Sequence, residues 1–236
     1  MPMPTSGATT ANHHIVTVIV AAGSGSRFGG DLPKQFTDLC GRPVLMHTVE
    51  AFRRAIPGGR IIVVLSPRNT GLWASLCQRH NFTSPQVVSG GDTRWQSVRN
   101  ALAEVTSTAK VILVHDGARP LVDAPLIQRV AHMAGHGGVA VVPVVPVTDS
   151  LRRTDTNQAV DRSLFCAVQT PQGFHALTLL EAYNAPFRAE FTDDASVVES
   201  AGYHVTTVCG SPENIKITYP ADILWAEAVL AARNKK

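Results

Sequence analysis

The apolar run IVTVIVAA (residues 15–22) leads directly into GSGSRFGGDLPKQF (residues 23–36), a glycine-rich segment. The first part is continuously apolar, as expected of a strand that is buried on both faces of a parallel sheet. The second part carries two cationic side chains, Arg27 and Lys34. A loop that follows such a strand lies at the carboxyl edge of the sheet, where ligands bind in open α/β folds. We therefore expect an anion-binding loop at that edge.

Similar apolar runs recur along the chain, at residues 60–66, 110–116, 138–144 and 203–208. Segments with a helical pattern separate them, at residues 42–55, 97–105, 125–135, 175–183 and 220–233. This alternation of strands and helices predicts an α/β fold with a doubly wound, mostly parallel sheet and right-handed crossovers.

One stretch, at about residues 147–170, interrupts the alternation. Two short extended segments flank a polar centre there, which predicts a β-arm that protrudes from the sheet domain. Because a two-stranded ribbon is only marginally stable alone in water, we expect the arm to pack on a second copy in a homodimer. An arm folded back on its own domain is the alternative. The rest predicts a single domain over residues 14–236, after a disordered tail at residues 1–13.

Composition excludes several classes of protein. The chain has 236 residues, 44% of them hydrophobic, and a formal net charge of +3 without any lysine or arginine block, which argues against nucleic-acid binding. No apolar run approaches the ~20 residues of a membrane span. The four cysteines are widely spaced, so neither a zinc site nor a disulfide framework is predicted. A cytoplasmic protein that acts on small anionic molecules fits these features.

The first glycine loop matches neither common nucleotide-binding template. A dinucleotide fingerprint would place a third glycine at Phe28 and an acidic residue at the end of the second strand, near residues 66–68. The lysine–serine or lysine–threonine pair of a P-loop is also absent. Gly23 and Gly25 let backbone N–H groups approach phosphate oxygens, and the two cations of the loop suit a triphosphate. A structural turn with two solvated cations is the alternative for this loop taken alone.

Two further segments supply polar groups. GGDTRWQSV (residues 90–98) is a second glycine turn, which we expect to lead into a helix opened by Ser97 and to offer its backbone to a base edge. HDGARPLV (residues 115–122) follows an apolar strand, so Asp116 would lie at the carboxyl end of the sheet. A carboxylate there suits Mg²⁺, which prefers carboxylate, water and phosphate oxygens. Taken alone, Asp116 is more simply interpreted as a helix cap or turn residue, so its interpretation as a metal ligand depends on the other segments.

Other polar residues have structural interpretations. His115 is interpreted as a satisfied, partly buried histidine rather than a metal ligand. TDDASVVE (residues 192–199) predicts a capped helix that begins at Asp193 or Asp194.

Together these segments resemble the 2-C-methyl-D-erythritol 4-phosphate cytidylyltransferases of the non-mevalonate isoprenoid pathway. The resemblance covers about residues 15–230 and is carried by AAGSGSRFGGDLPKQF, GGDTRWQSV, HDGARP, VDRSLFCAVQTPQGF, TDDASVVE and ENIKIT. It implies a Rossmann-like nucleotidyltransferase fold and Mg²⁺-dependent transfer of a cytidylyl group from CTP to 2-C-methyl-D-erythritol 4-phosphate. A cytidylyltransferase for ribitol 5-phosphate, another sugar-phosphate nucleotidyltransferase, and a nucleotide-binding module without catalysis are the alternatives.

The resemblance also implies roles for individual residues. The catalytic cations would be Arg27 and Lys34. The nucleotide site would comprise Ala21, Ala22, Gly23, Gly25, Gly91, Asp92, Ser97, Gly117 and Lys216. The sugar-phosphate site would comprise Asp116, Arg119, Ser150, Arg162, Thr170 and Lys216, and Asp116 would also hold the metal. Arg162 would reach the site across the dimer through the arm, and Ser150 keeps the hydroxyl of the family's usual threonine.

Overall fold

A computed structural model describes residues 12–23, 28–29, 32–137 and 139–233. The expectations for Gly25 and Arg27 lie outside the described residues, as does the expected tail up to residue 11.

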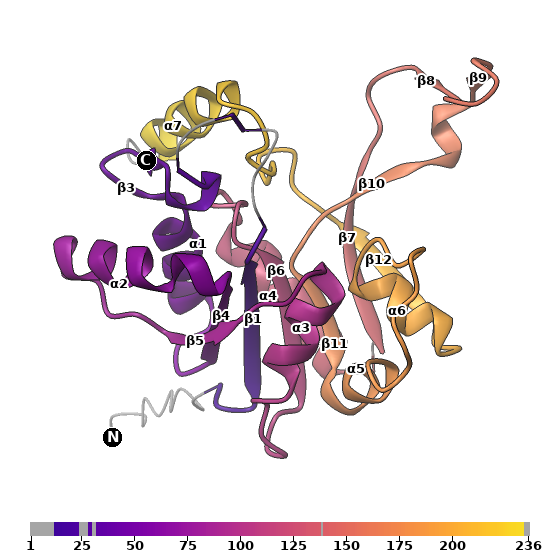
Figure 1. The fold of residues 1–236 in the computed structure, drawn as a ribbon. Helices are drawn as coiled ribbons and strands as arrows, with labels where there is room; N and C mark the ends of the chain where they lie inside the picture. The colour runs from indigo at the N-terminus through magenta and orange to yellow at the C-terminus, as the bar shows by residue number, and fades with distance from the viewer. Residues whose placement is uncertain (1–11, 24–27, 30–31, 138, 234–236) are drawn as a thin grey trace, which may run out of the picture.

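In the described part of the chain, eight strands form one sheet (Figure 1). Their order is β10-β7-β11-β6-β1-β4-β5, and β12 also pairs with β7. They are β1 (Ile15–Ala21), β4 (Arg60–Leu65), β5 (Gln86–Ser89), β6 (Val111–Asp116), β7 (Ala140–Pro146), β10 (Cys166–Val168), β11 (Gln172–His175) and β12 (Val205–Cys209). Strand β1 pairs in parallel with β4 and β6, whereas β10 and β11 are antiparallel to their neighbours. The predicted α/β fold with a mostly parallel sheet is confirmed.

Helices cover both faces of the sheet. One apolar cluster lies under α1 (Val44–Ala55), α2 (Thr70–Arg79) and α4 (Ala124–Gly135), and a second lies under α3 (Arg94–Leu102), α5 (Ala176–Ala182) and α6 (Asp194–Ser200). A third, smaller cluster packs α7 (Ala221–Arg233) against Phe28, the start of α1 and the short strand β2 (Asp38–Leu39), which pairs with β3 (Arg42–Pro43). Among the described helices, none has both the length and the apolar character needed to cross a membrane.

Helix α3 begins earlier than the sequence analysis expected. Thr93 is its N-cap and accepts a hydrogen bond from the Gln96 N–H at 3.0 Å, so the helix starts at Arg94. The expectation that Ser97 opens the helix is therefore wrong, because the threonine three residues before Gln96 provides the cap. Ser97 lies inside the first turns and is buried.

The segment between β7 and β10 forms an arm that extends away from the sheet domain (Figure 1). Within it, β8 (Leu151–Arg152) and β9 (Ala159–Val160) pair as a short antiparallel ribbon, followed by the 3-10 helix η3 (Arg162–Leu164). Leu164 is 78% exposed and Phe165 is 50% exposed. The arm thus protrudes, as predicted, instead of folding back on its own domain, and it leaves apolar side chains exposed to solvent.

Gly173 in β11 gives a test of the packing between the sheet and α4. A Cβ at this position would lie 2.6 Å from Val130 Cγ1 and 3.2 Å from Ala134 Cβ, both on α4. Gly173→Ala is therefore expected to lower the free energy of unfolding by about 1–3 kcal/mol, the usual cost of overpacking a core. Urea denaturation measures this change. Gly71→Ala is the matched control, since an added Cβ there has nothing within 4 Å; equal midpoints for the two variants would contradict the expectation.

Candidate active site

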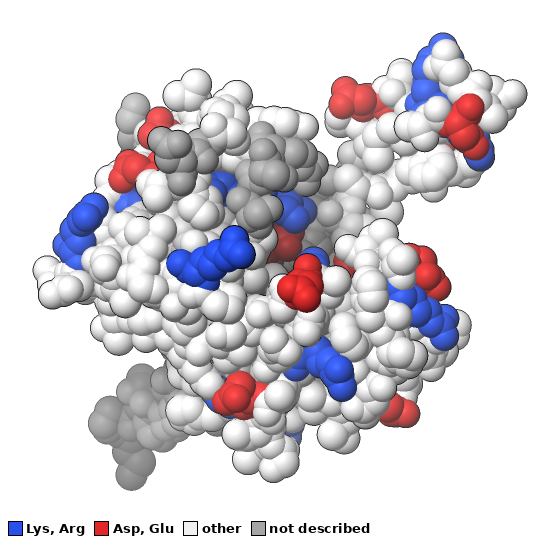
Figure 2. Space-filling view, in the orientation of Figure 1, with Lys and Arg blue, Asp and Glu red and all other residues white. Residues whose placement is uncertain are grey.

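A pocket of about 520 Å³ opens at the carboxyl ends of β1 and β6. Figure 2 shows acidic and basic side chains gathered in a hollow near the centre of this face. The predicted residues that line the pocket are Ala21, Ala22, Gly23, Lys34, Gly91, Asp92, Ser97, Asp116 and Lys216. The sheet topology therefore brings four separate segments of the chain to one cavity.

The sequence analysis missed six residues of the pocket wall. They are Val20, Gln35, Thr93, Arg94, Ala118 and Thr218. Arg94 is the chemically important one, because it adds a third basic side chain to those of Lys34 and Lys216. A signal was present in the sequence, since a cation directly follows the glycine turn at residues 90–93, as cations also follow the first glycine loop.

Lys34 is held at the pocket by the residues that follow it. It begins the 3-10 helix η1 (Lys34–Phe36), in which Gln35 and Phe36 are buried. The Gln35 Nε2 donates hydrogen bonds to the Ala21 carbonyl at 2.8 Å and to the Gly23 carbonyl at 3.3 Å. These bonds tie the far end of the glycine loop to the end of β1, so the backbone at Lys34 has a fixed place beside the pocket.

The second glycine turn packs directly against the first loop. A Cβ at Gly90 would lie 2.5 Å from Ala22 Cβ, so only glycine allows this approach. The Ser97 hydroxyl accepts a hydrogen bond from the Gly91 N–H at 3.1 Å. The Asp92 N–H is bonded to the Gln96 side chain at 3.0 Å. The turn is thus braced by the first two turns of α3 and forms a wall of the pocket next to the end of β1.

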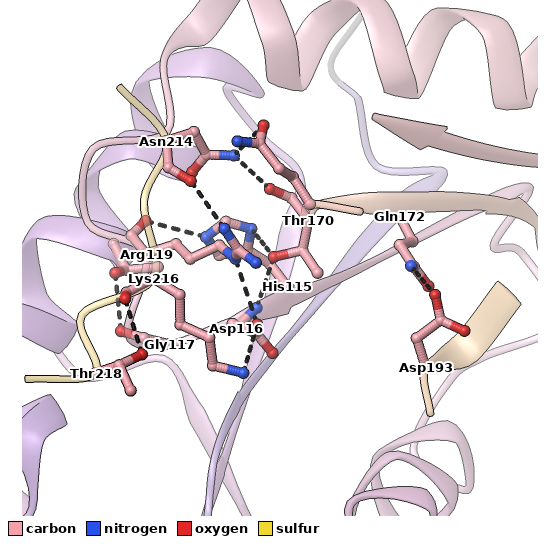
Figure 3. A network of polar contacts seen from close by, with 12 residues as sticks. His115, Asp116, Gly117, Arg119, Thr170, Gln172, Asp193, Asn214, Lys216 and Thr218 are labelled. Atoms are coloured by element: carbon pink, nitrogen blue, oxygen red, sulfur yellow. Dashed lines mark hydrogen bonds and ion pairs between the residues drawn. The ribbon is translucent and has the colours of Figure 1, made fainter. Parts of the chain in front are cut away.

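Asp116, at the end of β6, lies among three cations, of which Figure 3 shows Arg119 and Lys216. Its Oδ2 is 3.0 Å from Lys216 Nζ and 3.4 Å from Arg119 Nε, and its Oδ1 is 3.8 Å from Arg94 Nε. Burial of Asp116 opposes its ionisation, but the charges of these three residues outweigh it and hold its pKa well below the usual range. Asp116 is therefore a permanent anion at neutral pH that organises the cations around it.

His115 and Thr170 support Asp116 from inside the fold (Figure 3). His115 is fully buried, and burial lowers its pKa to about 3, so the ring is neutral. Its Nε2 lies 3.2 Å from the Arg119 carbonyl and must carry the hydrogen, because a carbonyl only accepts. The Nδ1 therefore accepts from the Thr170 hydroxyl at 3.0 Å, and that oxygen accepts the Asp116 N–H at 3.0 Å. The interpretation of His115 as a satisfied histidine is confirmed, and Thr170 contacts the site through the backbone of Asp116.

Lys216 reaches the pocket from the segment that follows β12. Asn214, which is fully buried, donates from Nδ2 to the Thr170 carbonyl at 2.8 Å. Its own carbonyl accepts a hydrogen bond from Arg119 Nη1 at 2.8 Å. These contacts dock the segment against the end of β6 and set Lys216 beside Asp116, as Figure 3 shows.

Five of the predicted residues that the structure describes do not line the pocket: Gly117, Arg119, Ser150, Arg162 and Thr170. Ser150 and Arg162 lie on the arm, where the Arg162 guanidinium donates to the Thr148 carbonyl. Gly117 follows Asp116 in the chain, but its N–H donates to the Val20 carbonyl at 2.8 Å. Its carbonyl accepts a hydrogen bond from a buried threonine hydroxyl at 3.0 Å. The polar backbone groups of Gly117 are thus engaged within the fold.

The donor set around Asp116 sets limits on metal binding. The described residues contain no group of three or more His, Cys, Asp or Glu side chains that could hold a metal ion. Mg²⁺ is often bound by one or two carboxylates together with substrate phosphates and water. Lys216 and Arg119 contact Oδ2 of Asp116, whereas the cation nearest to Oδ1, Arg94 Nε, lies 3.8 Å away. Asp116 can therefore offer one carboxylate oxygen to a magnesium ion whose other ligands would be chiefly phosphates.

Comparisons with known proteins agree on one family. The family model "IspD: 2-C-methyl-D-erythritol 4-phosphate cytidylyltransferase" matches residues 15–232. A 2-C-methyl-D-erythritol 4-phosphate cytidylyltransferase from Azobacteroides pseudotrichonymphae is 46% identical over 217 residues, which is 90% of this chain and 97% of that protein. Its counterpart from Bacteroides thetaiotaomicron is 45% identical over 216 residues, 90% of this chain and 98% of that protein. The crystal structure of the Thermus thermophilus enzyme of the same name has a TM-score of 0.72 and 34% identity, covering 92% of this chain and 98% of that one.

Proposed function

Since the chain belongs to the 2-C-methyl-D-erythritol 4-phosphate cytidylyltransferase family, we propose that its pocket at the ends of β1 and β6 is the site of cytidylyl transfer. The enzyme transfers the cytidylyl group of CTP to 2-C-methyl-D-erythritol 4-phosphate, in isoprenoid precursor biosynthesis. The products are 4-diphosphocytidyl-2-C-methyl-D-erythritol and pyrophosphate. The observation that carries the placement is the meeting of two glycine loops with Lys34, Lys216 and Asp116 in one cavity. The names of the relatives favour methylerythritol phosphate over ribitol 5-phosphate as the acceptor.

The reaction needs charge neutralisation more than a general base. A phosphate monoester has its second pKa near 6 and is mostly dianionic at pH 7, so it can attack the α-phosphorus of CTP without losing a proton. A phosphorus–oxygen bond to the acceptor forms as the bond to pyrophosphate breaks, and pyrophosphate leaves with the electron pair. The buried histidine beside Asp116 is neutral, with both nitrogens engaged, and takes no part in proton transfer. Holding the two anions in line can contribute about 7–11 kcal/mol.

In this proposal each wall of the pocket has its own task. The backbone of residues 21–23 and of the turn at residues 91–92 holds the nucleotide. Lys34, with Arg27 from the part of the loop outside the described residues, balances charge on the triphosphate and the departing pyrophosphate. Lys216 and Arg119, fixed by Asp116, face the acceptor phosphate. Magnesium, when bound at Asp116, would neutralise phosphate charge and help to orient the triphosphate.

A second copy of the chain would complete the acceptor site. Arg162 and Ser150 lie on the arm, which extends away from the sheet domain (Figure 1), and neither lines the pocket of its own chain. Leu164, Phe165 and Val168 on or beside this arm are 78%, 50% and 45% exposed, so association would remove apolar surface from water. We propose a homodimer in which the arm packs on the partner and brings Arg162 to the partner's pocket.

Two broader expectations from the sequence stay predictions. The first is a single domain over residues 14–236. The second is a cytoplasmic location, where CTP would be available to the enzyme.

Arg162→Ala is expected to raise KM for 2-C-methyl-D-erythritol 4-phosphate about tenfold or more while KM for CTP changes less than threefold. One charge-assisted hydrogen bond to phosphate contributes about 1.5–3 kcal/mol, which corresponds to this range. Steady-state kinetics with each substrate varied in turn measures the split. Arg152→Ala is the matched control, since Arg152 lies on the same arm and donates to the Asn157 carbonyl. Equal changes in both KM values would refute the assignment.

The function itself is tested by pyrophosphate release. The purified chain, given CTP, MgCl₂ and 2-C-methyl-D-erythritol 4-phosphate, is expected to release one pyrophosphate for each molecule of diphosphocytidyl product seen by mass spectrometry. Ribitol 5-phosphate is expected to support turnover at least 100-fold less well. Absence of pyrophosphate with the methylerythritol substrate, or preference for ribitol 5-phosphate, would overturn the proposal.

A further inference from the structure

A fully buried carboxylate lies next to the pocket without lining it. Asp194, the first residue of α6, is 0% exposed. Its two oxygens accept hydrogen bonds from Arg94 Nη1 at 2.9 Å and Nη2 at 2.7 Å, so the pair is bidentate. The Tyr183 hydroxyl also donates to Asp194, at 2.7 Å. Burying a charge is costly unless it is paired in this way, and bidentate pairs also fix direction.

The backbone around Asp194 is itself firmly held. Asp193 and Ser196 form a capping box at the start of α6, with the Ser196 N–H 2.9 Å from Asp193 Oδ1. Gln172 of β11, which is fully buried, accepts from the Ala195 N–H at 3.0 Å and donates to Asp193 Oδ2 at 2.6 Å. Figure 3 shows this contact between Gln172 and Asp193. Asp194 thus stands between two residues that the sheet holds in place, and its carboxylate is a fixed anchor.

Arg94 carries the effect of that anchor to the pocket. It is the first residue of α3, directly after the turn at residues 91–93, and it lines the cavity. Its Nε lies 3.8 Å from Oδ1 of Asp116. Burial would lower the pKa of Arg94, but the adjacent Asp194 more than offsets this, so the guanidinium stays charged. Arg94 therefore joins three parts of the chain: the nucleotide turn, the pocket carboxylate and the start of α6.

We propose that Asp194 is a positioning residue for cytidylyl transfer. It acts through Arg94, which holds the turn at residues 91–93 and Oδ1 of Asp116 in fixed positions relative to each other. The inference rests on the proposed function, because the turn and Asp116 are the groups assigned there to the nucleotide and the metal. With Asp194 in place, both Nη atoms of Arg94 are engaged by its carboxylate. Without that charge, the guanidinium is drawn to its other carboxylate neighbour, Asp116. It would then occupy Oδ1 of Asp116, the residue assigned to magnesium, and pull the start of α3 with it.

The test is a double-mutant cycle with the full chain, using Asp194→Asn, Arg94→Met and the double variant. Asp194→Asn is expected to lower kcat/KM for CTP about 30-fold or more, with KM for the sugar phosphate within threefold of wild type. The double variant is expected to be no slower than Arg94→Met, because the two residues act as one unit. The urea midpoint of the double variant is nevertheless expected to exceed that of Asp194→Asn, since the double variant no longer contains a partly buried cation that has lost its buried carboxylate partner.

Tyr183→Phe is the matched control, because it removes one hydrogen bond to Asp194 and leaves the pair with Arg94 intact. Its kcat/KM for CTP is expected to stay within threefold of wild type. The inference would be overturned if the losses in kcat/KM for CTP caused by the two single substitutions multiplied in the double variant. It would also be overturned if Asp194→Asn lowered the urea midpoint but left kcat/KM for CTP unchanged. Wild-type chain is assayed alongside: if it releases no pyrophosphate from CTP and methylerythritol phosphate, the proposed function fails and this inference fails with it. If the wild type is active but the losses caused by Asp194→Asn and Arg94→Met are independent, only the role of Asp194 is rejected and the proposed function stands.

Discussion

Lys34→Ala is expected to lower kcat for cytidylyl transfer about 10²–10³-fold, the usual loss when one charge-stabilising group is removed from a preorganised site. Lys34 lines the pocket, and the buried Gln35 ties its backbone to the carbonyls of Ala21 and Gly23. The backbone that carries the Lys34 ammonium is thus held in place, so the side chain needs little reorganisation when charge develops on the triphosphate. Single-turnover measurement of pyrophosphate release separates the loss in chemistry from any loss in binding.

Two further variants sharpen this test. Lys34→Arg keeps the charge but replaces a compact ammonium with a planar fork, and it is expected to recover less than a tenth of wild-type kcat. Lys110→Ala is the matched control, because Lys110 precedes β6 at the edge of the sheet opposite Asp116. It is expected to leave kcat unchanged. A loss of less than tenfold in Lys34→Ala would remove this lysine from the proposed chemistry.

Asp116→Asn is expected to reduce kcat/KM for both substrates about 100-fold or more. The substitution preserves shape but removes the anion that Lys216 contacts at 3.0 Å and Arg119 at 3.4 Å. The three cations then repel one another, and an amide N–H₂ faces donors rather than accepting from them. Kinetics with each substrate varied measures the loss. Asp123→Asn is the matched control, since Asp123 caps α4 and asparagine caps a helix about as well.

The pH dependence of the wild type adds a check on the same residue. The pKa of Asp116 lies below its usual range in the folded chain, so its ionisation stabilises the fold above that range and the contribution is lost only in strong acid. His115 likewise stays neutral above its pKa of about 3. The kcat profile from about pH 5 to pH 9 should therefore contain no titration from either residue. An acidic limb that disappears in Asp116→Asn would contradict this.

Much of the site could be recognised along the chain. The first loop, which contains Lys34, follows one apolar run, and Asp116 ends another. The carboxyl ends of parallel strands meet at one edge of the sheet, so these residues could be expected to lie together. The N-cap of α6 was likewise predicted from its aspartates and is confirmed at Asp193. The start of α3 was placed three residues late, although the capping threonine, Thr93, is a local signal that was available.

The contacts that tune the site could not be recognised in this way. Arg94 and Asp194 are 100 residues apart, and their pairing depends on how β11 docks the start of α6. The neutral His115 and its bond to Thr170 depend on burial and on a partner 55 residues away. The alternation of strands and helices, the loop chemistry and the helix caps depend on neighbouring residues, so they can be recognised directly along the chain. The charge state and orientation of Asp116 come from cations that folding brings within 4 Å, and electrostatic interactions act through space rather than along the chain.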